Sequence, residues 1–428
     1  MTPFSQHNPY SSQRSATYSR RGMVATSQPL AAQVGRDILA AGGNAVDAAI
    51  ASAAALTVVE PTSNGIGGDA FALVWIRDDN GSGRLHGLNA SGAAPQALTR
   101  EAVAAAGHEH MPMYGWTPVT VPGAPSAWAE LSRCFGVLDF ETLLAPAIRL
   151  AREGFPVSPV VSELWHRAAA RFGKAFTEDS TKNWFATFTP NGRAPKPGEM
   201  FTSPDHAATL EAIAQTRGES FYRGALAERI DAFSRATGGY LRATDLAAHE
   251  AEWVEPIRTN YRGVDVWEIP PNGQGLVALM GLNIMGGFDD LHARDDITVL
   301  HRQCEAMKLA YTDGHEYIAH APDMRTPVEA LLSDAYAKSR RDLIDDTALD
   351  PTPGQPHAGG TVYLATADDR AIWCRSSRAT STVSARAWSY RAPASVCTTE
   401  GTGSRSIPTT TIPWRRAKNR FIPSFLVF

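Results

Sequence analysis

The chain has 428 residues, 43% of them hydrophobic and 20% charged, and a formal net charge of -4. This composition predicts a soluble globular protein of one or two domains. It excludes a polyanion-binding surface over the whole chain, so we expect no nucleic-acid partner. The polar N-terminus predicts no secretory signal, and no apolar run is long enough to span a membrane. The four cysteines show neither metal-ligand nor disulfide spacing, which favours a reduced, cytoplasmic setting without a metal or cofactor.

The N-terminal part of the chain is predicted to contain one short strand followed by two helices. A polar leader at 1–21 precedes a predicted buried strand at 22–28, and a helix follows at 29–41. The Ala-rich residues 45–58 predict a second helix, whose small side chains suit close approach by other elements. Asp47 lies in the first turn of this helix, where the helix dipole favours an anion.

A glycine-rich stretch and a hairpin follow. The sequence NGIGGDAF (64–71) has three glycines that suit an anion cradle, but it lacks the Lys-Ser/Thr pair of a P-loop and does not follow a strand. We therefore interpret it as a structural turn. It leads into two predicted strands, 71–76 and 84–88, which Asp79-Asn80-Gly81 joins into a hairpin.

The middle of the chain is predicted to be mostly helical. Residues 140–250 have helical spacing with prolines as punctuation, and 297–317 predict another helix rich in alanine and aromatic residues. Strands are predicted around 261–263. The triplet His-Glu-His at 108–110 resembles a metal cluster, but no further ligand lies nearby at helical or hairpin spacing, so we expect a surface loop. Without a regular βαβ alternation, these elements indicate an α+β or layered α/β architecture.

The stretch HAGGTVYLATADD (357–369) has two interpretations. A Pro-, Gly- and Asp-rich run ends at Gly360, and β-branched Thr361 starts an alternation that is typical of a strand. Alternatively, Gly360-Thr361 is a self-cleavage site. Thr361 would then become a new N-terminal residue whose hydroxyl is activated by its own α-amino group. The motif alone favours the ordinary strand.

The composition of the chain changes at residue 371. Residues 371–428 contain nine arginine and lysine residues against one acid, Glu400, and apolar periodicity nearly vanishes. Such a segment is either a basic tail that binds nucleic acid or a membrane, or a disordered segment. A third explanation depends on a family comparison.

Seven motifs occur in order between about Gly22 and Asp369. They are AAQVGRDILAAGGNAVDAAIA, NGIGGDAF, VPGAPSAW, GGYLRATDLAAHEAEWVEPI, YRGVDVWEIPPNGQG, EAMKLAYTDGHEYI and GGTVYLATAD. In these motifs the chain resembles the γ-glutamyltranspeptidase family of N-terminal-nucleophile hydrolases. The resemblance implies a four-layer αββα sandwich of the α+β class. It also implies a cofactor-free precursor that is cut before Thr361 into a large subunit (22–360) and a small one that starts with 361–370.

The chemistry that the resemblance implies fits the residues at the cut. Thr361 Oγ would attack the Gly360 carbonyl and give an ester that water hydrolyses, and Gly360, without a Cβ, allows the bent backbone that this attack requires. The freed α-amino group, with an ordinary pKa of about 7.7–8.0, would then serve as general base for Oγ. We therefore predict Thr361 as the catalytic residue of an enzyme for small amides or peptides such as glutathione, without a membrane partner.

One position departs from the family pattern. Transpeptidases carry an arginine that clamps the glutamyl α-carboxylate, in a segment similar to Arg-Glu-x-Ala-Pro, and this chain has Ser91-Gly92-Ala93-Ala94-Pro95 instead. Serine cannot make the bidentate, charged contact of arginine. Ser91 is therefore a candidate substrate-binding residue for a different acyl group, or a turn residue at the end of a strand.

The tail suggests a shifted reading frame. The small subunit of this family is expected to continue with a Gly- and Asn-rich strand region, which 371–428 do not show. We hypothesise that one base was lost near the codons for Arg370 and Ala371. With freely chosen synonymous codons the other frame reads GNMVSFEQSNFNGFGSG and later PGKEPFHTIIP, which is family-like. We accordingly expect 371–428 to be poorly ordered, the oxyanion-hole loop to be missing and the chain as written to be inactive.

Three functions follow from these observations. The first is an autocleaved γ-glutamyltransferase-like precursor that transfers or hydrolyses γ-glutamyl groups of glutathione-like amides. Ser91 keeps open a β-lactam side-chain acylase or another amidase on the same fold. From a different class, the chain is an inactive frameshifted remnant, or a binding protein that uses its basic tail. Cleavage between Gly360 and Thr361 distinguishes an enzyme from a remnant.

Overall fold

The structure is a computed structural model, and it describes residues 16–78, 80–175, 181–291, 295–324, 326–349, 360–368 and 373–380. The strands are β1 (Gly22–Thr26), β2 (Phe71–Arg77), β3 (Gly83–Asn89), β4 (Phe155–Pro156), β5 (Met200–Phe201), β6 (Glu252–Val254), β7 (Ile257–Tyr261), β8 (Val264–Glu268), β9 (Gly360–Asp368) and β10 (Trp373–Thr380). The helices are α1 (Pro29–Ala40), α2 (Ala45–Val59), α3 (Arg100–Ala105), α4 (Ala124–Phe135), α5 (Phe140–Glu153), α6 (Pro159–Ala175), α7 (Lys182–Phe188), α8 (Pro204–Thr216), α9 (Glu219–Arg223), α10 (Ala225–Ala236), α11 (Ala243–Ala247), α12 (Gly275–Gly286), α13 (Ile297–Tyr317), the 3-10 helix η2 (Ala321–Asp323), α14 (Val328–Leu331) and α15 (Asp334–Arg341).

A six-stranded antiparallel sheet organises the fold. Its strand order is β1-β9-β10-β2-β3-β6, so the two C-terminal strands fill the positions between β1 and β2. The β1–β9 ladder ends with Thr26 opposite Leu364, and the β10–β2 ladder ends with Ser377 opposite Phe71. The sheet is therefore continuous only because β9 and β10 join strands that come from the first part of the chain.

The N-terminal elements lie close to the predicted positions. The first strand ends two residues early, at Thr26, because Gln28 already caps α1. Its side-chain oxygen accepts a hydrogen bond from the backbone N–H of Leu30 (2.5 Å). Helix α2 runs one residue further than predicted, and the predicted hairpin is confirmed, with β2 and β3 slightly longer than expected.

Helix α2 is buried along its whole length. It contacts β1, β9 and β10 of the sheet as well as α1, α4 and α5, and its alanines permit these close approaches. A capping box fixes its start: Asn44 Oδ1 accepts from the Asp47 N–H (2.9 Å), and Asp47 Oδ2 accepts from the Asn44 N–H (3.0 Å). Asp47 in the first turn is therefore a capping residue.

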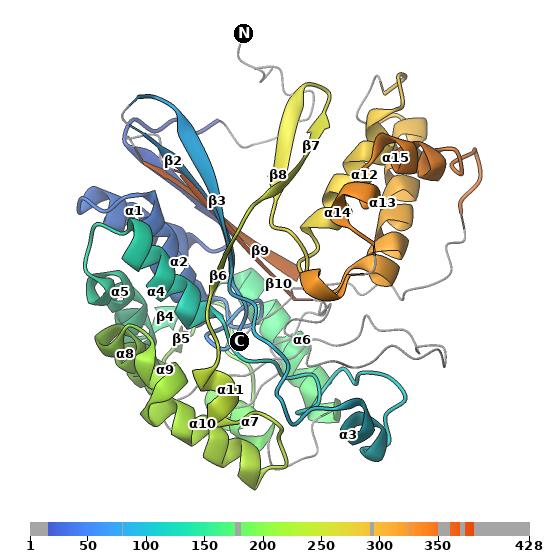
Figure 1. The fold of residues 1–428 in the computed structure, drawn as a ribbon. Helices are drawn as coiled ribbons and strands as arrows, with labels where there is room; N and C mark the ends of the chain where they lie inside the picture. Colours follow the sequence, from blue (N-terminus) through green and yellow to red (C-terminus); the bar gives the residue numbers. More distant parts are fainter. Residues whose placement is uncertain are drawn as a thin grey trace.

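Elements are layered on both sides of the sheet (Figure 1). Helices α1, α2, α4 and α5 lie on one side, and the β7–β8 hairpin with helices α12 to α15 lies on the other. The sheet meets this second side through Phe71 and Leu73, which contact Ile269 and Trp267. The order of helices, six-stranded sheet, strand pair and helices confirms the expected α+β sandwich.

The helical region predicted at 140–250 is confirmed and has an aromatic core. Trp165 contacts Phe201 with ring centroids 4.8 Å apart, and Phe172 contacts Trp184 at the same separation, both edge to face. The rings of Trp165 and Phe172 belong to α6, which they anchor against α7 and β5. This region packs into the same hydrophobic core as α2.

Helix α13 starts and ends where the sequence predicts, at residues 297 and 317. It packs on α12 through hydrophobic clusters that are separate from the main core and that include Val277, Met280 and Ala310. The β7–β8 hairpin, predicted as strands around 261–263, pairs from Ile257 to Glu268 and contacts α12.

Part of the C-terminal tail pairs in the sheet. We predicted poor order from residue 371, whereas β10 spans Trp373–Thr380. This strand was missed because its sequence, WCRSSRAT, lacks apolar alternation, and pairing with β9 and β2 on its two sides overrides that local signal. Residues 381–428 lie outside the described residues, and the shifted frame stays a prediction.

Candidate active site at the end of the central sheet

Gly360 and Thr361 are the first two residues of β9. On one side they pair with Thr380 and Ala379 of β10. On the other side the β1 ladder ends where Thr26 pairs with Leu364, three residues after Thr361, and beyond Thr26 the chain turns into α1. The predicted strand is confirmed. The predicted nucleophile thus lies at the end of an inner strand, where β1 no longer pairs with it.

An acidic residue precedes the strand beside β10. Thr361 pairs with Ala379, and two residues earlier in β10 Ser377 pairs with Phe71, the first residue of β2. Asp69 lies two residues before Phe71, in the segment that leads into β2. Thr361 and Asp69 therefore lie at the same end of the sheet, next to strands on either side of β10.

Ser91 lies at the same end of the sheet. Asn89 pairs with the first residue of β2, and the Ala90 N–H donates to the Ala70 carbonyl (2.9 Å), which extends the ladder by one pair beyond the strands. The next N–H, that of Gly92, donates to the Asp69 side chain (3.1 Å), so the ladder ends there. The strands β2 and β10 lie between Ser91, which follows β3, and the strand that holds the predicted nucleophile.

Ser91 belongs to a buried, neutral cluster with Asn89 and Asn272. Its hydroxyl donates to Asn89 Oδ1 (2.7 Å) and accepts from Asn272 Nδ2 (3.0 Å), while Asn89 Nδ2 donates to Asn272 Oδ1 (2.9 Å). All three residues are buried. The hydroxyl proton of Ser91 is therefore engaged within the cluster, and this position offers no positive charge for a carboxylate.

Close backbone crossings hold this end of the sheet together. A Cβ built on Gly92 would lie 1.6 Å from the Val121 carbonyl oxygen, and one on Gly123 would lie 1.5 Å from the Ala90 carbonyl oxygen. The Gly68 carbonyl accepts from the Gly123 N–H (2.7 Å). Only glycine fits such approaches. The motifs NGIGGDAF and VPGAPSAW are therefore adjacent in space, and the first is a structural turn as predicted.

Asp69 is a buried acid near the candidate site that sequence reasoning did not single out. It is 7% exposed, and its Oδ1 accepts from the Gly92 N–H (3.1 Å). Burial raises the pKa of this carboxyl to about 7, and the Gly92 hydrogen bond lowers it by less. The sequence did offer a signal, since this acid stands directly between a glycine turn and an apolar strand. We interpreted it only as part of the turn.

A second buried acid lies where β1 ends beside β9. Glu60, which follows α2, accepts a hydrogen bond from the Ser27 hydroxyl (2.5 Å), and Ser27 follows β1. Burial raises the pKa of Glu60, against the opposing effect of the Ser27 and Ser63 hydroxyls. Asn64 donates to the Leu56 and Glu60 carbonyls (3.0 and 3.1 Å) and closes the end of α2. These contacts fix the position of the segment from the end of α2 to Asn64.

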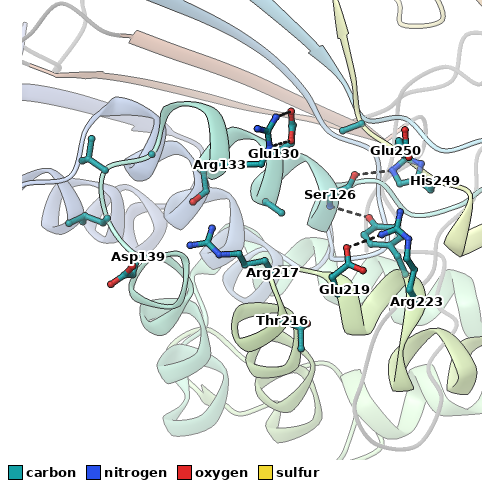
Figure 2. Close-up of a pocket in the computed structure, with 17 residues that line it drawn as sticks. Ser126, Glu130, Arg133, Asp139, Thr216, Arg217, Glu219, Arg223, His249 and Glu250 are labelled. Atoms are coloured by element: carbon teal, nitrogen blue, oxygen red, sulfur yellow. Dashed lines mark hydrogen bonds and ion pairs between the residues drawn. The ribbon is translucent and has the colours of Figure 1, made fainter.

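A pocket of about 980 Å³ is lined by α4, α8 and α9, with Ser126 and His249 at one end (Figure 2). Ser126 Oγ lies 2.8 Å from His249 Nε2 and 2.7 Å from the Gly123 carbonyl oxygen. The carbonyl can only accept, so Ser126 donates to it, and His249 donates to Ser126. A nucleophilic serine needs a histidine that accepts its proton. This pair is therefore a structural contact.

The triplet at 108–110 lies in a loop after α3, as predicted. Among the described residues, no three His, Cys, Asp or Glu side chains are arranged to hold a metal ion. None of the helices in the described ranges has the length and apolarity to cross a bilayer.

Comparison with known proteins agrees with this architecture. The family model described as gamma-glutamyltranspeptidase matches residues 31–374. The chain is 33% identical over 349 residues to the glutathione hydrolase-like YwrD proenzyme of Bacillus subtilis (strain 168), covering 81% of this chain and 64% of that protein. It is 34% identical to the acylase ACY 1 proenzyme of Pseudomonas sp. (strain SE83), covering 76% and 58%. The chain therefore spans about three fifths of the length of these relatives.

Among solved structures, a cephalosporin acylase from Bacillus halodurans is 48% identical, with a TM-score of 0.84, over 99% of this chain and 77% of that chain. The matched family region includes Asp69, Ser91, Gly360 and Thr361. Sequence motifs, layered fold and relatives agree, and the chain belongs to the γ-glutamyltranspeptidase family.

Proposed function

We propose that this chain is the precursor of a threonine-nucleophile amidohydrolase. In the first step Thr361 Oγ attacks the Gly360 carbonyl, the peptide nitrogen leaves as the α-amine of Thr361, and water hydrolyses the resulting ester. In the second step this amine accepts the Oγ proton while Oγ attacks a substrate amide, which releases an amine and leaves an acyl ester. Water, or an acceptor amine, then removes the acyl group.

One observation carries this proposal: Thr361 is the second residue of a strand inside the central sheet, at the end of the sheet where Asp69 and Ser91 are buried. Paired strands fix the position of a backbone better than a loop does, and the proposed reaction needs its groups held to fractions of an ångström. Because β1 does not pair with Thr361, water or a substrate can approach the reacting bond from that side of β9. The printed names of the relatives, which are proenzymes of a hydrolase and an acylase, support the same chemistry.

The neutral cluster around Ser91 decides which acyl group we propose. An acyl group with an α-carboxylate would meet two amides and a hydroxyl that already hydrogen-bond one another. A carboxylate buried there without a cation is costly. We therefore favour amides whose acyl group carries no α-carboxylate, as in the acylase alternative, over γ-glutamyl amides such as glutathione.

A matched pair of substrates, assayed with the chain whose reading frame is restored, tests this choice. The compounds 4-aminobutyryl-p-nitroanilide and γ-glutamyl-p-nitroanilide differ only by the α-carboxylate. We expect kcat/KM for the first to equal or exceed that for the second, and Thr361→Ala to abolish both while Thr361→Ser keeps both measurable. A preference of about tenfold or more for the γ-glutamyl compound, the advantage expected from a charged clamp, contradicts the neutral pocket.

The reading frame is tested with the same assay. The basic composition of 371–428, which lacks the Gly- and Asn-rich strand region expected for this family, is the reason for the shifted frame. We expect the frame-restored chain to hydrolyse the anilide and the chain as printed to be inactive. Turnover by the chain as written would contradict the frameshift hypothesis. Inactivity of both forms would contradict the proposed enzyme and favour an inactive remnant.

A further inference from the structure

The pocket between α4, α8 and α9 has no part in the proposed chemistry, and it is large enough to hold a small molecule (Figure 2). Its volume of about 980 Å³ lies within the range that ligand pockets in proteins usually occupy. All of its lining residues fall between 126 and 251. The lining therefore includes none of the residues of the candidate active site and none of the C-terminal tail.

Of the described residues, three arginines line this pocket, and two of them are paired within their own helices. In α4, Arg133 donates to both carboxylate oxygens of Glu130 (2.7 and 2.8 Å). In α9, Arg223 donates to Glu219 (2.9 Å). The positive charge of each of these arginines is thus balanced by a carboxylate one helical turn away.

Arg217 is the third arginine of the pocket, and its contacts differ. It forms no ion pair among the described residues, and its guanidinium carbon lies 5.8 Å from the centroid of the Phe140 ring. A ring face attracts the cation, but the in-plane N–H donors of a guanidinium need oxygen acceptors. In Figure 2 the Arg217 side chain extends from the end of α8 into the space below α4. Its charge is therefore available to a ligand in the pocket.

The backbone at Arg217 is also unusual. This residue caps the C-terminus of α8 with φ 51° and ψ 38°, the left-handed conformation. Glycine or asparagine normally occupies such a position, because the Cβ of a larger residue comes too close to the following carbonyl oxygen. Residues in strained conformations are concentrated at functional sites. Since glycine or asparagine would end α8 with less strain, the conformation favours a role for the Arg217 side chain itself.

The other charges of the pocket determine which anion fits beside Arg217. Asp139 and Glu250 line the pocket together with Glu130 and Glu219, and Asp139 makes no side-chain hydrogen bond to the helix that it precedes. The described lining thus has four carboxylates against three arginines. These carboxylates repel a dianion such as a phosphate monoester more strongly than a monoanion. A carboxylate also matches the planar guanidinium, which can donate two parallel hydrogen bonds to it.

Apolar side chains form another part of the pocket wall. Ala129, Val137 and Leu138 line the pocket, and Val137 is 55% exposed. Covering an exposed branched side chain with a ring or an alkyl group removes apolar surface from water, which is favourable. A ligand with a carboxylate and a small apolar body therefore fits both the charges and the wall.

We infer that this pocket is a second ligand site, which binds a small monocarboxylic acid by pairing its carboxylate with Arg217 and packing its apolar body against Val137. The inference uses neither Thr361 nor the proposed reaction. It also holds for either reading frame, because every lining residue precedes the tail.

Calorimetric titration of the full-length chain at pH 8 tests the inference. The probes are phenylacetate, phenylacetamide and phenyl phosphate, which share a phenyl ring and carry one negative charge, no charge and two negative charges. We expect phenylacetate to bind about tenfold more tightly than phenylacetamide, as a charge-assisted contact predicts, and more tightly than phenyl phosphate. Because Arg217 is exposed, this ratio should shrink as salt is raised from about 20 mM to about 0.5 M.

Variants at the left-handed position separate the charge of Arg217 from the fold. Arg217→Asn and Arg217→Gly both remove the guanidinium and tolerate a positive φ, so the thermal midpoint of unfolding should stay equal or rise. Each variant should lower the ratio between phenylacetate and phenylacetamide to about one. Arg235→Gln, which removes an arginine of α10 outside the pocket, is the matched control and should keep the ratio.

Three results would overturn the inference. The first is a ratio near one in the wild-type chain. The second is a ratio that persists in both Arg217 variants, which is also the result expected if phenylacetate binds at the candidate active site instead. The third is tighter binding of phenyl phosphate than of phenylacetate, because the carboxylates of the lining would then not select against a dianion.

Discussion

Replacing Asp69 by asparagine should change how the stability of the protein depends on pH. Burial holds the pKa of Asp69 at about 7 in the folded state, against about 3.9 in an unfolded chain. Between these values the folded protein binds one more proton than the unfolded protein, so the free energy of unfolding falls as pH rises and levels off above pH 7. Each pH unit costs about 1.4 kcal/mol. From pH 5 to pH 8 wild type should lose about 3 kcal/mol that Asp69→Asn does not lose.

The assay is urea unfolding of both proteins at pH 5, 6, 7 and 8. The quantity of interest is the difference between their free energies of unfolding, because all other titrating groups cancel in it. The variant should gain on wild type by about 1.4 kcal/mol for each pH unit up to pH 7 and no more beyond it. A difference that stays constant from pH 5 to pH 8 refutes the reasoning, since Asp69 would then ionise as easily in the folded as in the unfolded protein.

Three further predictions concern other parts of the fold. The Arg133 hydrogen bond lowers the pKa of Glu130 to about 2. In the same urea series, Glu130→Gln should be less stable than wild type by a constant free energy of unfolding from pH 5 to 8. This difference should shrink below about pH 4, where Glu130 becomes protonated in the unfolded protein. Gly92→Ala should lower the thermal midpoint steeply or abolish folding because of the clash with Val121, whereas Gly173→Ala, an open site in α6, should raise it slightly. Asn44→Ala should cost about 1–2 kcal/mol of unfolding free energy, and a loss near zero contradicts the capping box.

The elements with strong local signals could be predicted from the sequence. Helix α13 has a regular apolar period, and the β2–β3 hairpin has an Asn80-Gly81 turn between two apolar strands, so both lie within two residues of the prediction. Helix α2 has many small residues and is buried on every side. Its existence was predictable, but its contacts with β9 and β10 were not, because they join segments about 300 residues apart.

The candidate site was predictable only in part. Thr361 and Ser91 were identified through motif order, which names positions without placing them. Asp69 was overlooked because a single acid after glycines is typical of a turn, and its burial depends on the Gly92 segment that packs against it in the folded protein. The Asn272 contact with Ser91 likewise joins two loops 181 residues apart. Burial without a counter-charge is a property of the folded protein.

The central claim is that Thr361 is a nucleophile freed by cleavage after Gly360. Mass spectrometry of the purified, frame-restored chain, with N-terminal sequencing of the smaller fragment, tests it most directly. The account predicts two fragments, the smaller beginning with Thr361, and a single uncut chain for Thr361→Ala. An uncut chain in both proteins, or a new N-terminus at another residue, would contradict it.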